Sequence, residues 1–207
     1  MVAGAKGVCA MTDNEILEKV KLRWQELKAL NLSEIDTQVL LVEPILTIAG
    51  WDLLNYSQVK RASRSSKGQE FDIGLYSPTS SPYVFFAIEC KALQNAWFNI
   101  DRFTIKRKEI GQLKNIGKKS AYWVHNWGAC DGVGQLRAYC ANYDNSFSRE
   151  LSTAILTNGY DWVIFDTKTF VPEPGSLTAP ITMSAIKARA NLEDIRFAED
   201  IIDKLKP

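Results

Sequence analysis

The chain has 207 residues, of which 46% are apolar and 24% are charged, with a formal net charge of +1. These values are ordinary for a globular protein and provide enough apolar surface for a core, so a disulfide framework is not required. They exclude a histone-like chain and a strongly acidic one. At about 150 residues per domain, the length corresponds to one domain, or to one domain with an appendage.

The sequence predicts neither membrane association nor secretion. No apolar run approaches the roughly 18 residues that span a bilayer, and the first ten residues are too short and too weakly apolar for a signal peptide. The four cysteines show no CxxC spacing, and a single histidine argues against a Cys/His zinc site. Reduced thiols and a cytoplasmic location are therefore expected.

Two helices are predicted in the first 50 residues. Thr12 and Glu15 have the spacing of a capping box, and apolar residues follow at helical intervals, which predicts a helix over 13–30. Residues 1–11 are expected to be a disordered N-terminus. Ser33 is positioned to cap a second helix that ends at Gly50 and that Pro44 would kink.

After residue 51 the apolar period changes from that of a helix to that of a strand. Strands are predicted at 53–59, 70–76, 83–91, 153–157 and 161–169, a basic helix at 103–118, an extended segment at 121–127, and further helices at 131–143 and 183–205. This order predicts an α/β protein with a mixed central β-sheet flanked by helices.

Three polar residues on two neighbouring predicted strands form the strongest candidate site. Side chains alternate along a strand, so Glu89 and Lys91 share a face while Cys90 points the other way. Pairing of the two strands would bring Asp72 beside Glu89. Two clustered carboxylates repel each other unless a cation holds them, and hard oxygen ligands suit Mg²⁺, with Mn²⁺ as a substitute.

A lysine beside such a metal can orient or deprotonate the attacking water, or stabilise charge on a phosphate. Together these groups are what metal-assisted phosphodiester hydrolysis requires. A plain Glu89–Lys91 ion pair on an exposed sheet face, with Asp72 elsewhere, is the simpler alternative.

The spacing of these residues resembles the PD-(D/E)xK nuclease motif, with Phe71 where the motif often has proline. The segments 33–38, 43–46 and 49–52 resemble the first helix of the N-terminal nuclease domain of type I restriction enzyme R subunits. Residues 135–139 resemble that family's downstream Q-x-x-x-Y motif, and 155–162 its late strand pair. The resemblance runs from about residue 33 to residue 170.

The resemblance implies a restriction-endonuclease-like core over 12–182 and an Mg²⁺-dependent DNA endonuclease. Catalysis would depend on Lys91, Asp72, Glu89 and Glu34, with Asp72 and Glu89 as the metal ligands. Asp36 is the alternative to Glu34 as the helix acid. Gln135 and Tyr139 would lie near the site or the DNA.

The implied partners are DNA and a separate helicase or methyltransferase subunit, because the chain has no P-loop of its own. The interval between Lys91 and Gln135 is long for the family. The segment 183–207 is expected to be a helix that packs on the domain or on a partner, such as a second copy of the chain.

Basic residues are concentrated in the middle of the chain, where 60–119 holds twelve basic and five acidic residues. Lys106, Arg107 and Lys108 are the candidates in this stretch for binding the DNA backbone. Solvated loops and helix faces are the alternative explanation. Two rival functions therefore remain: a nuclease fold that binds DNA or joins a complex without cleavage, and a module that binds another protein.

Overall fold

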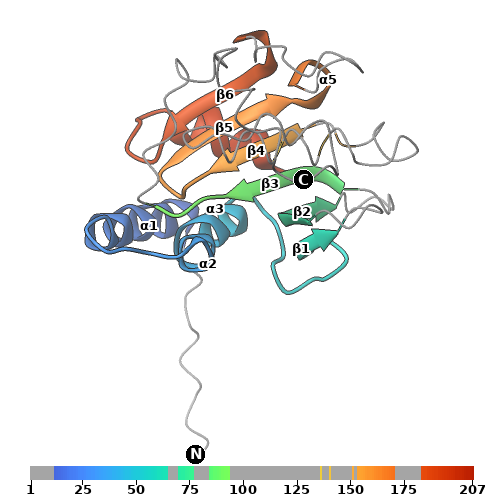
Figure 1. Cartoon of the computed structure of the whole chain (residues 1–207). Helices are drawn as coiled ribbons and strands as arrows, with labels where there is room; N and C mark the ends of the chain where they lie inside the picture. The colour runs from blue at the N-terminus through green and yellow to red at the C-terminus, as the bar shows by residue number, and fades with distance from the viewer. Residues whose placement is uncertain are drawn as a thin grey trace, which may run out of the picture.

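A six-stranded mixed β-sheet forms the centre of the computed structural model, which describes residues 12–64, 70–76, 84–93, 136, 140, 151, 153–170 and 183–207 (Figure 1). The strands, in their order across the sheet, are β1 (Val59–Arg64), β2 (Glu70–Tyr76), β3 (Val84–Cys90), β4 (Thr153–Thr157), β5 (Asp161–Asp166) and β6 (Ile186–Asn191). Only the β3–β4 pair is parallel. The predicted α/β class with a mixed, helix-flanked sheet is confirmed.

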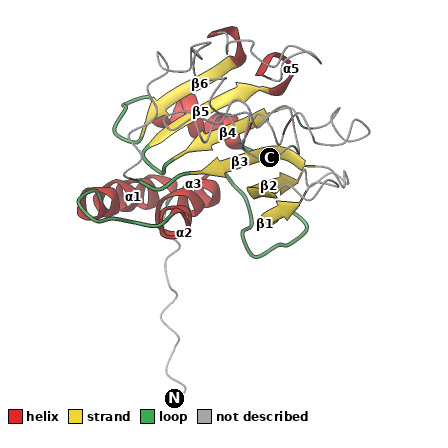
Figure 2. Cartoon of the chain, in the orientation of Figure 1, coloured by secondary structure: helices red, strands yellow, loops and turns green. Residues whose placement is uncertain are grey.

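Short helices surround this sheet (Figure 2). They are α1 (Asp13–Leu27), α2 (Glu34–Thr37), the π-helical turn η1 (Gln38–Val42), α3 (Glu43–Ile48), α5 (Thr167–Phe170), the 3-10 turn η6 (Met183–Ala185), the π-helical turn η7 (Ala198–Ile202) and α6 (Asp203–Leu205). Within the described ranges, no helix is long and apolar enough to cross a membrane.

The predicted starts of the first two helices are confirmed. The Thr12 side chain accepts a hydrogen bond from the Glu15 amide, and Ser33 accepts one from the Asp36 amide, so both helices begin with a capping box. Pro44 has no amide hydrogen to donate to the preceding turn, which accounts for the wide turn η1 at this point. Gly50, with φ 97°, ends α3 as predicted.

The strand predicted at 53–59 is wrong, because residues 52–58 form turns and β1 begins only at Val59. Two side chains stabilise these turns. Asp52 accepts a hydrogen bond from the Leu54 amide, and Asn55 accepts one from the Ser57 amide, both at 3.0 Å. Such local bonds from Asp and Asn compete with strand pairing.

The single helix predicted at 183–205 is also wrong. Residues 186–191 form β6, which pairs antiparallel with β5. The Asn191 amide donates to the Asp194 carboxylate at 2.6 Å and turns the chain, so the helix is limited to residues 197–205. The strand predicted at 161–169 ends at 166 and continues as α5.

Several predicted segments lie outside the described residues: 1–11, 103–118, 121–127 and most of 131–143. Within the last of these, Leu136 and Cys140 are described, and both are helical and buried.

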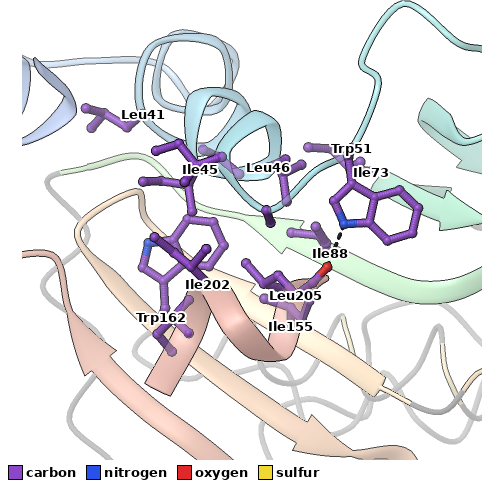
Figure 3. Packing of buried hydrophobic residues seen from close by; sticks show 14 of the residues in the cluster. Leu41, Ile45, Leu46, Trp51, Ile73, Ile88, Ile155, Trp162, Ile202 and Leu205 are labelled. Atoms are coloured by element: carbon purple, nitrogen blue, oxygen red, sulfur yellow. Dashed lines mark hydrogen bonds between the residues drawn. The ribbon is translucent and has the colours of Figure 1, made fainter. Parts of the chain in front are cut away.

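Apolar side chains fill both faces of the sheet. On one face, η1, α3 and the C-terminal helix pack over Ile73, Ile88 and Ile155 (Figure 3), and α1 joins the same cluster through Leu17 and Val20. In the same cluster the buried Trp51 indole donates a hydrogen bond of 2.6 Å to the Leu205 carbonyl. The C-terminal helix is thereby bound to the core. A second cluster on the opposite face includes Ala87, Leu136 and Phe165.

The turn between β4 and β5 contacts the second helix at Gly159. This residue has φ 82°, and a Cβ atom placed on it would lie 2.7 Å from the Leu41 Cβ. Glycine is needed here both for its backbone conformation and for the close approach of η1.

We predict that Gly159→Ala lowers the free energy of unfolding by about 2–5 kcal/mol, because it adds left-handed strain to a core clash. Urea denaturation measures this effect. Gly50→Ala is the matched control, since Gly50 also has positive φ but its added Cβ would meet nothing closer than 3.7 Å. That variant should lose only about 1 kcal/mol. Equal losses in the two variants would contradict the packing argument.

Candidate active site

The end of β3 is held between β4 and the second helix. The Lys91 amide donates to the Thr157 carbonyl at 2.8 Å, and the Leu93 amide donates to the Thr37 hydroxyl at 3.0 Å. Glu34 lies one helical turn before Thr37 and therefore on the same face of α2. This anchoring brings the first residue of α2 to the last residues of the central strand.

The pairing of the neighbouring strand β2 with β1 and β3 is interrupted at Asp72. Ile73 pairs with Arg61 of β1 and with Ile88 of β3, whereas Asp72 has no partner in either register. Opposite it on β1, Ala62 has φ 50°, which interrupts the regular strand conformation. The Asp72 carboxylate instead accepts a hydrogen bond of 2.7 Å from the Cys90 amide. The side chain of Asp72 is thus fixed to the end of β3.

Four of the residues singled out from the sequence converge at this place. The Lys91 ammonium lies 2.7 Å from Glu89 Oε1 and 3.3 Å from Glu34 Oε1. The Glu89 side chain is only 4% exposed, whereas that of Glu34 is 48% exposed. The cluster therefore reaches from the protein interior to its surface. The alternative of an exposed Glu89–Lys91 pair does not match this burial.

The structure distinguishes the two candidate helix acids. The Asp36 carboxylate accepts hydrogen bonds from the Ser33 hydroxyl at 2.7 Å and from the Ser33 amide at 3.3 Å. Its role is to cap α2. Glu34, rather than Asp36, faces Lys91.

Glu89 is an unusual buried acid. Its pKa is raised to about 8, chiefly by burial and next by the Asp72 carboxylate, while Lys91 opposes this rise. Its second oxygen, Oε2, is buried and has no hydrogen-bond partner among the described residues. Burial also raises the pKa of Asp72, although the Cys90 amide and Lys91 counteract it. Two neighbouring carboxyls that resist ionisation are typical of a site built to bind a cation.

In contrast to the two acids, the Lys91 side chain favours its charged form. Burial lowers its pKa, but the carboxylates of Glu89, Glu34 and Asp72 outweigh burial and raise the pKa above the usual lysine value. In this arrangement Lys91 is an ammonium that donates hydrogen bonds.

The carboxyl groups fit a divalent metal ion by their chemistry. Within the described residues, no three His, Cys, Asp or Glu side chains stand together as a ready-made metal site, because the lysine lies between Glu34 and Glu89. The unpartnered Glu89 Oε2 is nevertheless a free oxygen donor beside a second carboxylate. Mg²⁺ suits a site in which the protein provides few hard oxygen ligands and water and phosphate complete the coordination.

Five other predicted site residues cannot be placed relative to this cluster. Gln135, Tyr139, Lys106, Arg107 and Lys108 lie outside the described residues. Cys140, next to the predicted motif, is buried on the Glu89 face of the sheet, and both burial and the Glu89 carboxyl raise the pKa of its thiol. Cys90 packs into the core on the opposite face, as alternation predicts.

Arg61, one of the basic residues of the 60–119 stretch, has a structural role and is not a free surface charge. Arg61 forms two hydrogen bonds of 2.7 Å with the buried Glu43 carboxylate. Sequence reasoning missed this pair. Its signal was an acid within the apolar stripe of a helix, since a buried carboxylate needs a partner.

Comparison with known proteins provides no relative for this chain: no family model, no curated protein and no solved structure matches it.

We predict that the stability of the metal-free protein falls as pH rises from about 4.5 to about 8, the ordinary and raised pKa values of Glu89. In this window the folded state holds a Glu89 proton that the unfolded chain has released, so the contribution is complete below the window and lost above it. Its slope is at most about 1.4 kcal/mol per pH unit.

Urea denaturation in EDTA at several pH values measures this slope. Glu89→Gln stays uncharged throughout and should flatten it. Glu34→Gln, whose parent side chain is 48% exposed, should keep it. A Glu89→Gln protein with the wild-type slope would show that another group is responsible.

Proposed function

We propose that the protein is a metal-dependent DNA endonuclease that hydrolyses phosphodiester bonds. The convergence of Glu34, Asp72, Glu89 and Lys91 at the end of the central strand carries this proposal. A plain ion pair would stabilise the fold better than two acids with raised pKa values beside a buried ammonium. The arrangement is therefore better explained by a function than by stability. The resemblance of this spacing to the PD-(D/E)xK motif supports the same reaction.

We also propose that the mixed sheet is a restriction-endonuclease-like core. The motif residues lie on two adjacent strands, β2 and β3, and the acid comes from the helix that precedes them. This is the arrangement that the resemblance to type I restriction R-subunit nuclease domains leads one to expect.

Asp72 and Glu89 would hold Mg²⁺, and Glu34 would assist directly or through water. When bound, the metal would supply Lewis-acid stabilisation of the phosphate and a more acidic water. Lys91, as an ammonium, would orient the attacking water and stabilise negative charge on the phosphate. The reaction adds this water oxygen to phosphorus and breaks one P–O ester bond.

Two measurements distinguish an endonuclease from a non-cleaving DNA-binding module. Plasmid nicking in Mg²⁺ or Mn²⁺ tests the reaction, and a salt-dependent gel shift in EDTA tests binding alone. Binding without nicking by the purified protein would favour the non-cleaving module, and neither activity would favour a protein-binding module.

We predict that Lys91→Met abolishes nicking, with a loss of about 10²- to 10⁴-fold, while Mn²⁺ still binds. Methionine keeps much of the buried stem but cannot donate a hydrogen bond to water or phosphate. Nicking rates and Mn²⁺ titration calorimetry provide the two measurements. Lys21→Gln is the control, because Lys21 pairs with Glu18 on α1, far in the chain from Lys91, and should not affect nicking. Wild-type nicking by Lys91→Met would remove Lys91 from the mechanism.

We predict that Asp72→Asn leaves the metal-free protein as stable as wild type or more stable. The amide oxygen can still accept the Cys90 hydrogen bond, and above about pH 8, where Glu89 is also ionised, the change relieves repulsion of about 1 kcal/mol between two carboxylates. The rise in melting temperature that Mg²⁺ gives by binding the folded state should disappear.

Thermal melts with and without divalent metal measure this prediction. Asp36→Asn is the matched control, since its parent carboxylate caps α2 and does not face Lys91; it should keep the metal effect. A destabilised Asp72→Asn protein, together with a wild type indifferent to metal, would contradict the metal site.

A further inference from the structure

A second group of residues lies on the same sheet face as Glu89. The Lys60 ammonium is placed over two tyrosine rings, 4.2 Å from the centroid of Tyr76 and 5.4 Å from that of Tyr56. The Tyr76 side chain is buried, whereas Tyr56 is 75% exposed. The lysine thus connects a ring of the core to a ring on the surface.

Strand register places this group beside the candidate active site. Lys60 lies opposite Gly74 of β2, and Gly74 lies opposite Ala87 of β3. Ala87 and Glu89 are two residues apart and share a face of the sheet. Two strand spacings and two residues along β3 separate the backbones of Lys60 and Glu89 by about 12 Å.

The charge of Lys60 is not neutralised by its described surroundings. Among the described residues, no carboxylate lies within 4.0 Å of its ammonium, in contrast to the adjacent Arg61, which points to the other face and binds Glu43. An ammonium without an acidic partner beside a site for phosphate chemistry is suited to bind a further phosphate.

The exposed Tyr56 ring adds a second kind of contact. Lys60 contacts it by a cation–π interaction, which limits the orientations of the ring. An aromatic side chain with a free face is a stacking platform for a nucleobase. A base within a regular duplex offers its face only to its neighbours in the stack, so this contact requires an unpaired or splayed base.

We propose that Tyr56 and Lys60 form a subsite for an unpaired nucleotide of the DNA strand that enters the active site. Lys60 binds a phosphate of that strand, and Tyr56 stacks on its base. This inference rests on the proposed function for its ligand. It implies that DNA with an unpaired stretch is bound more tightly than a continuous duplex.

The test compares a single-stranded oligodeoxynucleotide with its duplex by fluorescence anisotropy in EDTA, where binding does not depend on metal or cleavage. Tyr56→Ala should weaken single-strand binding by about 5- to 150-fold, the value of one stacked base. Tyr56→Phe keeps the ring and should bind as wild type. Duplex binding should change little in either variant.

Lys60→Gln should weaken single-strand binding and reduce its log–log salt slope by about 0.7, the value for one phosphate contact. Lys28→Gln is the matched control, because Lys28 also lies over an aromatic ring, 5.0 Å from the centroid of Trp24, but at the end of α1. Leu54→Ala, at a neighbouring residue that is 95% exposed, controls for general surface change. Neither control should alter binding.

Single-strand binding by Tyr56→Ala at the wild-type level would overturn the subsite, as would an equal loss in Tyr56→Phe. A salt slope unchanged in Lys60→Gln would overturn the phosphate contact. Failure of the proposed nuclease reaction is a separate result: a wild type that does not nick DNA, but whose single-strand binding depends on Tyr56, would keep the subsite and lose the endonuclease.

Discussion

The buried carboxyl of Glu89 is the constraint to which the surrounding structure responds. A carboxylate inside a protein costs several kcal/mol unless it is paired or neutral. Here one oxygen is paired with Lys91, and the other has no hydrogen-bond partner in the part of the chain that the structure describes. A protein retains such an arrangement at a cost in stability, which the apolar clusters on both faces of the sheet offset. The cost of this carboxyl supports the proposed metal site.

Two further features bring partners to this carboxyl. The β2 ladder is interrupted at Asp72, opposite the left-handed Ala62, and the freed side chain binds the end of β3. The anchoring of α2 through Thr37 brings Glu34 to Lys91. Backbone strain of this kind is commonly found at functional sites. The site is thus built from the buried end of β3, the interrupted strand β2 and the start of α2.

The two faces of β1 show how neighbouring basic residues acquire different roles. Arg61 points toward α3 and is neutralised by Glu43, so it stabilises the packing of helix on sheet. Lys60, one residue earlier, points to the face of the candidate active site and lies over tyrosine rings. Alternation along a strand is enough to separate a structural charge from one suited to a ligand.

Local features could be predicted from the residues alone: the capping boxes at Thr12 and Ser33, the strands 70–76 and 153–157, and the shared face of Glu89 and Lys91. These depend on neighbouring residues, so periodicity and capping chemistry are sufficient. The folded arrangement was needed to choose between Glu34 and Asp36, to show that Glu89 is buried and to pair Arg61 with Glu43. It also showed that 186–191 is a strand, because pairing with β5 outweighs a helix-like pattern. Each of these depends on residues that are distant in the chain and meet only when the sheet forms.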